Sequence, residues 1–171
     1  MTRSIAAVLA VLALTLSACA SLPKFEAAGD VHDFLVSIRN ADRAAFDAHV
    51  DKPALKAQLR ARLLAETAKA KGGDSLQVLG ALFAGPLVDA AADALIRPEV
   101  FRAVAEYLGY KPEQAIPDRF VIAQALRRID TDRVCAVEKK SGPCVLTFQN
   151  EGGTWKLVGF DGDLGRLKPR R

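Results

Sequence analysis

After an apolar N-terminal segment, the first two thirds of the chain repeat apolar side chains at helical spacing. This pattern predicts a helix with Asp30 at its N-cap, a short helix around Phe46, and a longer helix capped by Asp51. A strongly apolar helix is expected over 76–88, and a further helix begins at Pro98. These helices, about five in number, are followed by a loop that contains two prolines.

From Phe120 onward the apolar residues change to the alternating spacing that is typical of strands. Four strands are expected, over 119–128, 133–138, 144–149 and 154–160. Short polar or glycine-containing segments separate them, which favours an antiparallel meander. A run of helices followed by a run of strands predicts an α+β fold, in which N-terminal helices pack on a C-terminal four-stranded antiparallel meander.

The first 18 residues have the build of a secretory signal peptide. Arg3 supplies a positive charge, an apolar run extends from Ile5 to Leu16, and small residues precede Cys19. The run is too short for a comfortable membrane span. An ordinary signal peptide followed by a chance cysteine remains the alternative to the interpretation that follows.

The sequence Leu16-Ser17-Ala18-Cys19 resembles the lipobox of bacterial lipoproteins. The resemblance implies that the thiol of Cys19 takes a diacylglycerol, that the mature chain begins there, and that acyl chains such as palmitate anchor it to a membrane. Because one chain binds a bilayer only marginally and each buried methylene contributes about 0.8 kcal/mol, several chains would hold the protein firmly. Ala20 after the cysteine implies the outer membrane, with the domain facing the periplasm.

These features divide the chain into a signal peptide (1–18), a lipidated tether (19–28), a single α+β domain (29–165) and a basic tail (166–171). The net charge of +4 is a weak basic bias. No basic stripe interleaved with aromatic residues occurs, so nucleic acid is not an expected partner. The tail is interpreted as a solvated end, or alternatively as a segment that contacts anionic lipid.

If lipid takes Cys19, the remaining cysteines are the pair Cys135 and Cys144. An even remainder in an oxidising compartment predicts a disulfide. Folding the hairpin about Lys139-Lys140 places the two cysteines directly opposite each other. Two cysteines and distant histidines are too few for a metal site, so no metal or other cofactor is expected.

The sequence offers little support for catalysis. His32 and His49 lack partners at metal-ligand spacing and are interpreted as structural or surface residues. Asp89 and Asp93 favour a ladder of exposed charges over a catalytic carboxylate pair. Asp161-Gly162-Asp163 lacks the later ligands of a calcium loop, and no nucleophile or phosphate-binding motif occurs. We therefore expect a protein that is not an enzyme.

Two sets of segments resemble known families. Residues 34–46 and the closing strand 152–158 are similar to cone-shaped α+β domains of the nuclear-transport-factor-2 type. Residues 79–89 and 118–120 resemble an uncharacterised bacterial envelope family that is known only as a domain of unknown function. Both resemblances imply a fold and no activity.

The favoured hypothesis is a lipid-anchored envelope protein with a structural role or an envelope protein partner. The alternative is a periplasmic carrier that holds a lipid or another apolar small molecule between sheet and helices. A third hypothesis, a weak hydrolase or isomerase, needs a polar cluster for which Gln124 is the main candidate. The candidate apolar ligand or core surface consists of Leu79, Leu82, Phe83 and Leu87.

Overall fold

The computed structural model describes residues 22–69, 86–138 and 141–161. The helices in these ranges are α2 (Leu22–Asn40), α3 (Arg43–Ala48), α4 (Lys52–Lys69), α6 (Pro86–Leu95), α7 (Pro98–Tyr107) and α8 (Arg119–Ala125). The strands are β1 (Leu126–Arg128), β2 (Arg133–Val137), β3 (Cys144–Glu151) and β4 (Thr154–Phe160). They form one antiparallel sheet in the order β1-β2-β3-β4, which confirms the predicted α+β fold.

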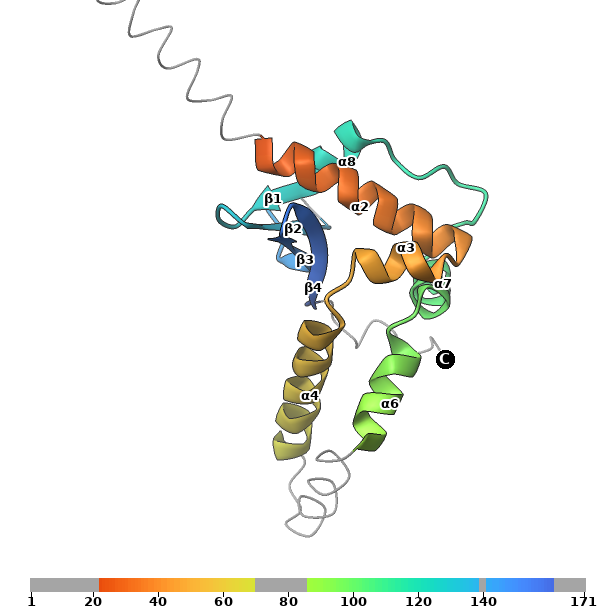
Figure 1. Ribbon diagram of the computed structural model, residues 1–171, viewed down its shortest axis with the longest axis vertical. Coiled ribbons are helices and arrows are strands. Elements are labelled where there is room, and N and C mark those ends of the chain that lie inside the picture. The colour runs from red at the N-terminus through yellow and green to blue at the C-terminus, as the bar shows by residue number, and fades with distance from the viewer. Residues whose placement is uncertain (1–21, 70–85, 139–140, 162–171) are drawn as a thin grey trace, which may run out of the picture.

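The long helix α2 spans the body of the molecule beside the sheet (Figure 1). The short helix α8 lies along the N-terminal part of α2, and α3 and α7 lie near its C-terminal end. Helices α4 and α6 run together away from the body as an arm. Among the described helices, none combines the length and apolar character needed to cross a bilayer.

The first helix begins earlier than the sequence predicted. It begins at Leu22, inside the segment 19–28 that was expected to be a tether, and Asp30 lies in its interior instead of at its N-cap. Ala27 and Ala28 are fully buried, because this part of α2 packs against α8 and the sheet.

The strand predicted over 119–128 is also wrong, because all but its last three residues form helix α8. The carboxylate of Asp118 accepts a hydrogen bond from the backbone N–H of Val121 at 3.0 Å and caps this helix. Ile122 is buried in the core. The N-cap and the burial of one helix face outweigh the strand-like local pattern.

The predicted break after the first helix and the predicted cap of the third are confirmed. Ala41 between α2 and α3 has a φ of 53°, and Asp42 caps α3 by accepting from the N–H of Ala45 at 3.0 Å. Asp51 accepts in the same way from the N–H of Ala54 at 3.0 Å and caps α4. The chain therefore changes direction between α2 and α3 and again between α3 and α4.

Four phenylalanine rings from different elements form the centre of the core. Phe34 of α2 lies 5.6 Å from Phe46 of α3, 6.0 Å from Phe101 of α7 and 5.9 Å from Phe148 of β3, measured between ring centroids. Phe46 and Phe101 lie 5.2 Å apart in an edge-to-face arrangement. Such pairs add about 0.5–1.5 kcal/mol beyond the area that they bury, so this cluster ties the helices to the sheet.

The outer edge of β4 is paired with the segment between α3 and α4. The N–H of Leu157 donates to the carbonyl oxygen of His49 at 2.9 Å, and the N–H of Asp51 donates to the carbonyl oxygen of Leu157 at 3.0 Å. Val50 and Leu157 thus form a parallel bridge. This pairing covers part of the sheet edge and fixes the point from which α4 leaves the body.

The predicted disulfide between Cys135 and Cys144 is confirmed, with the two Cα atoms 5.4 Å apart. The predicted register is wrong, since Cys144 pairs with Val137 and Cys135 pairs with Thr147. The pairing shifts next to Val137, and this irregularity places the cysteines diagonally across β2 and β3. Residues 139 and 140 lie outside the described residues.

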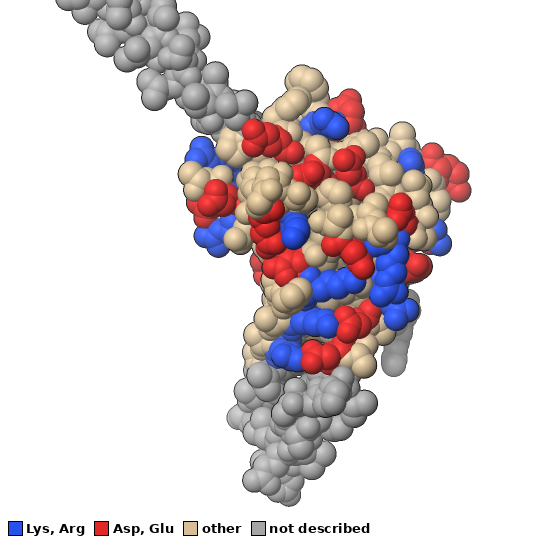
Figure 2. Space-filling model, in the orientation of Figure 1, with Lys and Arg blue, Asp and Glu red and all other residues tan. Residues whose placement is uncertain are grey.

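Asp89 and Asp93 are partly exposed on α6, as expected of surface charges, and both pair with basic residues of α4. Asp93 lies 2.7 Å from the Nζ atom of Lys56, and Asp89 pairs with Arg60. Figure 2 shows basic and acidic side chains alternating over the arm formed by α4 and α6. The hydrogen bond from Lys56 lowers the pKa of Asp93 below its ordinary value, with a further contribution from Coulomb attraction. These pairs hold the two helices of the arm together.

Candidate ligand pocket

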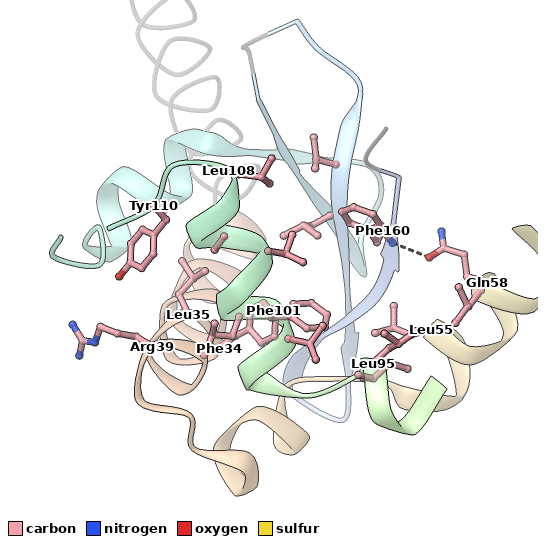
Figure 3. Close-up of a pocket in the computed structure, with 18 of the residues that line it drawn as sticks. Phe34, Leu35, Arg39, Leu55, Gln58, Leu95, Phe101, Leu108, Tyr110 and Phe160 are labelled. Atoms are coloured by element: carbon pink, nitrogen blue, oxygen red, sulfur yellow. Dashed lines mark hydrogen bonds between the residues drawn. The ribbon is translucent and has the colours of Figure 1, made fainter. Parts of the chain in front are cut away.

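A pocket of about 450 Å³ lies between the helices and the sheet (Figure 3). This volume falls within the range of about 300–1,000 Å³ that is typical of small-molecule sites. Its lining is predominantly apolar and includes Leu35 and Ile38 of α2, Leu55 and Leu59 of α4, Val100, Val104 and Ala105 of α7, and Val145, Leu146 and Phe160 of the sheet. Leu95 and Ile96, at the end of α6, complete one wall.

Helix α7 supplies one wall of the pocket because its apolar residues follow helical spacing. Pro98 begins the helix, and Gly109, with a φ of 102°, follows its end. Val100, Phe101, Val104 and Leu108 follow one another at helical spacing, and all four line the pocket. They face inward but leave a space between themselves and the sheet. Leu108 at the rim is 62% exposed.

At one end of the pocket lies a polar network between α4 and the end of β4. Gln58 accepts from the N–H of Phe160 at 2.8 Å, and its amide donates to Asp161 at 3.4 Å. Arg62 donates to the same carboxylate at 2.7 Å, and its guanidinium lies 5.8 Å from the ring centroid of Phe160. The polar groups at this end are thus bound to one another.

The other two polar lining residues, Arg39 and Tyr110, lie on the opposite side of the pocket from Gln58 (Figure 3). Arg39 donates from Nε to the side-chain oxygen of Asn40 at 3.2 Å. The hydroxyl of Tyr110 donates to the carbonyl oxygen of Gln114 at 3.2 Å. Both side chains are half-buried, so this end is a polar mouth of an apolar space.

The apolar residues that the sequence proposed for a ligand are not placed by the structure. Leu79, Leu82 and Phe83 lie outside the described residues, as does Cys19. Leu87 lies in α6, but the position of its side chain is not described. The apolar residues of α7 are recognisable in the sequence by their helical spacing. This spacing does not distinguish a helix that packs in a filled core from one that lines a cavity.

The two histidines have short-range partners. His49 at the end of α3 places Nδ1 2.9 Å from the carbonyl oxygen of Ala45 and Nε2 3.6 Å from Asp30. Asp30 in turn accepts from the backbone N–H of Trp155 at 2.7 Å. His32 lies 3.1 Å from the adjacent Asp33. The contact between Asp30 and His49 was not predicted, because only the packing of α2 against α3 brings the two residues together.

The remaining candidates for chemistry are scattered. Within the described ranges, no group of three or more His, Cys, Asp or Glu side chains could hold a metal ion. Gln124 is exposed on α8 and is not among the described lining of the pocket. The polar cluster required by the hydrolase hypothesis therefore does not form around Gln124.

A family model described as "Protein of unknown function (DUF2939)" matches residues 8–104. The matched range includes Leu16 to Cys19 and the helices from α2 into α7, and it ends before the sheet. No curated protein matches the chain, and no solved structure does. Because the match covers more than half of the sequence, this chain belongs to the DUF2939 family of proteins of unknown function.

Proposed function

We propose that this chain is a lipid-anchored envelope protein whose α+β domain carries an apolar or amphiphilic small molecule. The observation that carries the proposal is the pocket of about 450 Å³ between helices and sheet. Protein interiors are close-packed, and side chains around an unfilled space lose contacts. An apolar space of this size is therefore best explained by a ligand that fills it.

The pocket favours the carrier over the structural role that the sequence alone put first. The lining comes from both layers of the fold, and Leu95 and Leu108 at its rim are 51% and 62% exposed. Large apolar side chains around an opening are typical of an entrance for an apolar ligand. A space between helices and an antiparallel sheet also agrees with the resemblance to domains of the nuclear-transport-factor-2 type.

The anchor in this proposal is the lipobox-like sequence that ends at Cys19. If the mature chain begins there, only three residue steps separate the acylated cysteine from Leu22, the first described residue of α2. At about 3.6 Å per residue, the start of α2 would lie within about 11 Å of the lipid attachment. The domain would then sit directly on the bilayer with almost no tether.

An exposed apolar patch at this end of the molecule supports such a position. The patch consists of Phe25 on α2 and Phe120 and Val121 on α8, which are 42%, 68% and 51% exposed. The two rings lie 5.1 Å apart. Phe25 follows Leu22 by about one helical turn, so the patch would lie at the head-group boundary, where aromatic side chains are favoured.

Native mass spectrometry tests the carrier function. The full chain is released from cell membranes in a mild detergent and examined without denaturation. We expect the mass of the acylated chain plus one bound molecule, which denaturation releases. If the native and denatured masses agree after several different detergents, the pocket holds no carried ligand and the proposal fails.

Incorporation of radiolabelled palmitate tests the anchor. We expect label in the wild-type chain and none in a Cys19→Ser variant. A matched Cys135→Ser/Cys144→Ser variant, which keeps Cys19, should retain the label. Equal labelling of the Cys19→Ser variant, or no label in the wild type, would remove the anchor from the proposal.

A further inference from the structure

The charges around the pocket are unbalanced toward positive. Two of its polar lining residues are arginines, Arg39 and Arg62, and none of the described lining residues is acidic. Asp161 neutralises Arg62 at a distance of 2.7 Å. Arg39 has no such partner in the described part of the chain, where its side chain bonds to the uncharged Asn40. The excess positive charge therefore lies at the Arg39 end.

Arg39 is placed so that its two chemical halves face different surroundings. Leu35 lies one turn earlier on α2 and Ile38 directly precedes Arg39, and both line the apolar space. Arginine stems pack along apolar surfaces while the guanidinium reaches water. The Tyr110 hydroxyl directs its proton to Gln114, so Arg39 is the donor that remains for a ligand at this mouth.

The opposite end of the pocket does not offer this chemistry. Gln58 bonds to the backbone of Phe160 and to Asp161, and Asp161 neutralises Arg62, so no uncompensated positive charge remains at this end. A ligand with one polar end would place that end at Arg39 and its apolar part toward Leu55 and Phe160. Among the described lining residues, the uncompensated charge thus lies at the Arg39 end, and the pocket is apolar between its two polar ends.

From this arrangement we propose that the ligand is a single-chain amphiphile with an anionic head group, a carboxylate or a phosphate, which Arg39 binds at the pocket mouth. The guanidinium presents paired donors that match either anion, and charge-assisted hydrogen bonds are about twice as strong as neutral ones. This inference rests on the proposed carrier function, because it names the class of molecule that is carried.

Photoaffinity labelling of the full chain in vesicles prepared from cell membranes tests the inference. One probe is hexadecanoic acid with a diazirine in its chain, and the other is hexadecanol with the diazirine at the same carbon. The half-saturating concentration of each probe is measured for the wild type, Arg39→Gln and Arg39→Lys. Arg102→Gln is the matched control, because Arg102 pairs with Glu106 on α7 and is not among the described lining residues.

We expect Arg39→Gln to raise the half-saturating concentration of the acid about tenfold, which corresponds to about 1.4 kcal/mol, and to leave that of the alcohol unchanged. Because each variant is compared with the wild type for the same probe, partitioning of the probe into the vesicles cancels. Arg39→Lys should keep part of the preference, and Arg102→Gln all of it. Competition by unlabelled hexadecanoate and hexadecyl phosphate distinguishes a carboxylate ligand from a phosphate ligand.

The two ways of failing differ. If both probes label pocket residues saturably and Arg39→Gln changes neither, the anionic head group is wrong and the carrier function stands. If neither probe labels the pocket saturably, the carrier function itself fails.

Discussion

Asp30 is a single polar residue that joins three elements of the fold. It lies inside α2, accepts a hydrogen bond from the backbone of Trp155 in β4, and faces His49 at the end of α3. Trp155 is 2% exposed, so its N–H is remote from water. One carboxylate therefore fixes how the first helix sits on the last strand.

Replacing Asp30 with alanine should lower the free energy of unfolding by about 1–3 kcal/mol, because the buried N–H of Trp155 loses its acceptor. Asp30→Asn keeps an acceptor oxygen and should cost less. Urea unfolding of the chain, followed by the fluorescence of its single tryptophan, measures both effects. Asp33→Ala on the same helix is the control, and an equal unfolding midpoint for the two alanine variants would contradict the role given to Asp30.

The disulfide is the second residue-scale prediction. Cys135 and Cys144 close a loop with a sequence separation of 9, so the chain-entropy model gives about 2–3 kcal/mol. The Cys135→Ser/Cys144→Ser variant should lose about this much stability in urea, and so should the wild type treated with a reductant. Stability that is unchanged by the reductant would contradict this expectation.

The aspartates show what the sequence could and could not predict at this scale. Asp51 precedes a proline and an apolar stripe, and its role as a cap was predictable from these neighbours. Asp30 also precedes an apolar stripe and could have been a cap, but it lies within a helix. Its hydrogen-bond partner is the backbone of Trp155, 125 residues away in the sequence. Only tertiary packing distinguishes the two roles.

At the scale of elements, the arm formed by α4 and α6 depends on pairs between the two helices. Lys56 and Asp93 form one pair, and Arg60 and Asp89 form the next. All four side chains are partly exposed, so each pair is a modest contributor. The two pairs contribute mainly by fixing the alignment of α4 and α6 beside the pocket.

Lys56→Gln should raise the pKa of Asp93 toward its ordinary value, because the ammonium that lowers it is removed. Carboxyl titration by NMR checks this change, with Lys156→Gln, which removes a partner of Glu151, as the control. Since the folded-state pKa is lowered, the pair stabilises the fold above the ordinary pKa and loses this contribution as the pH falls through the lowered value. An unchanged titration of Asp93 would show that the pair does not form.

Element assignment from sequence succeeded where the local apolar pattern agreed with the tertiary packing and failed where packing and a cap outweighed it. Strands β2, β3 and β4 and helix α7 were predicted because their apolar periods extend over several residues. Helix α8 has only 7 residues, and its helical state depends on the Asp118 cap and on burial of Ile122 beside α2. The hairpin register was missed because an irregularity at Val137 leaves no clear local signal.

For the whole molecule, α2 connects the proposed membrane contact with the pocket. Phe25 lies near its start and Arg39 near its end, which separates them by about 21 Å along the helix at 1.5 Å per residue. With the Phe25 end at the bilayer, the mouth at Arg39 would face away from the membrane that holds Cys19. We therefore expect ligand exchange on the periplasmic side of the domain.

This orientation predicts that Val121 lies at the lipid surface and Ala103 does not. A cysteine introduced at either position is labelled with an environment-sensitive dye, and the acylated chain is reconstituted into vesicles of phosphatidylethanolamine and phosphatidylglycerol. The dye at 121 should be protected from iodide in the surrounding water, whereas the dye at 103 should be quenched, because Ala103 is exposed on α7 far along the body. Equal quenching would contradict the contact.

The pocket was the feature least accessible to sequence reasoning. An apolar stripe such as Val100 and Val104 looks the same whether it fills a core or lines a cavity. The volume depends on how far α4, α6 and α7 stand from the sheet, which the capping and pairing contacts set together. The lipid anchor and the disulfide were predicted from short local signals, namely the lipobox-like sequence and the two remaining cysteines. These predictions did not require knowledge of the fold.

Filling the pocket tests the carrier function most directly. Ala105 lines the pocket, and Ala103 on the same helix is exposed, so Ala105→Trp and Ala103→Trp form a matched pair. The measurement is saturable labelling of the full chain by the diazirine hexadecanoic acid, with urea unfolding to verify that both variants are folded. We predict that labelling is lost in Ala105→Trp and retained in Ala103→Trp; wild-type labelling of a folded Ala105→Trp chain would contradict the assignment of this pocket as the ligand site.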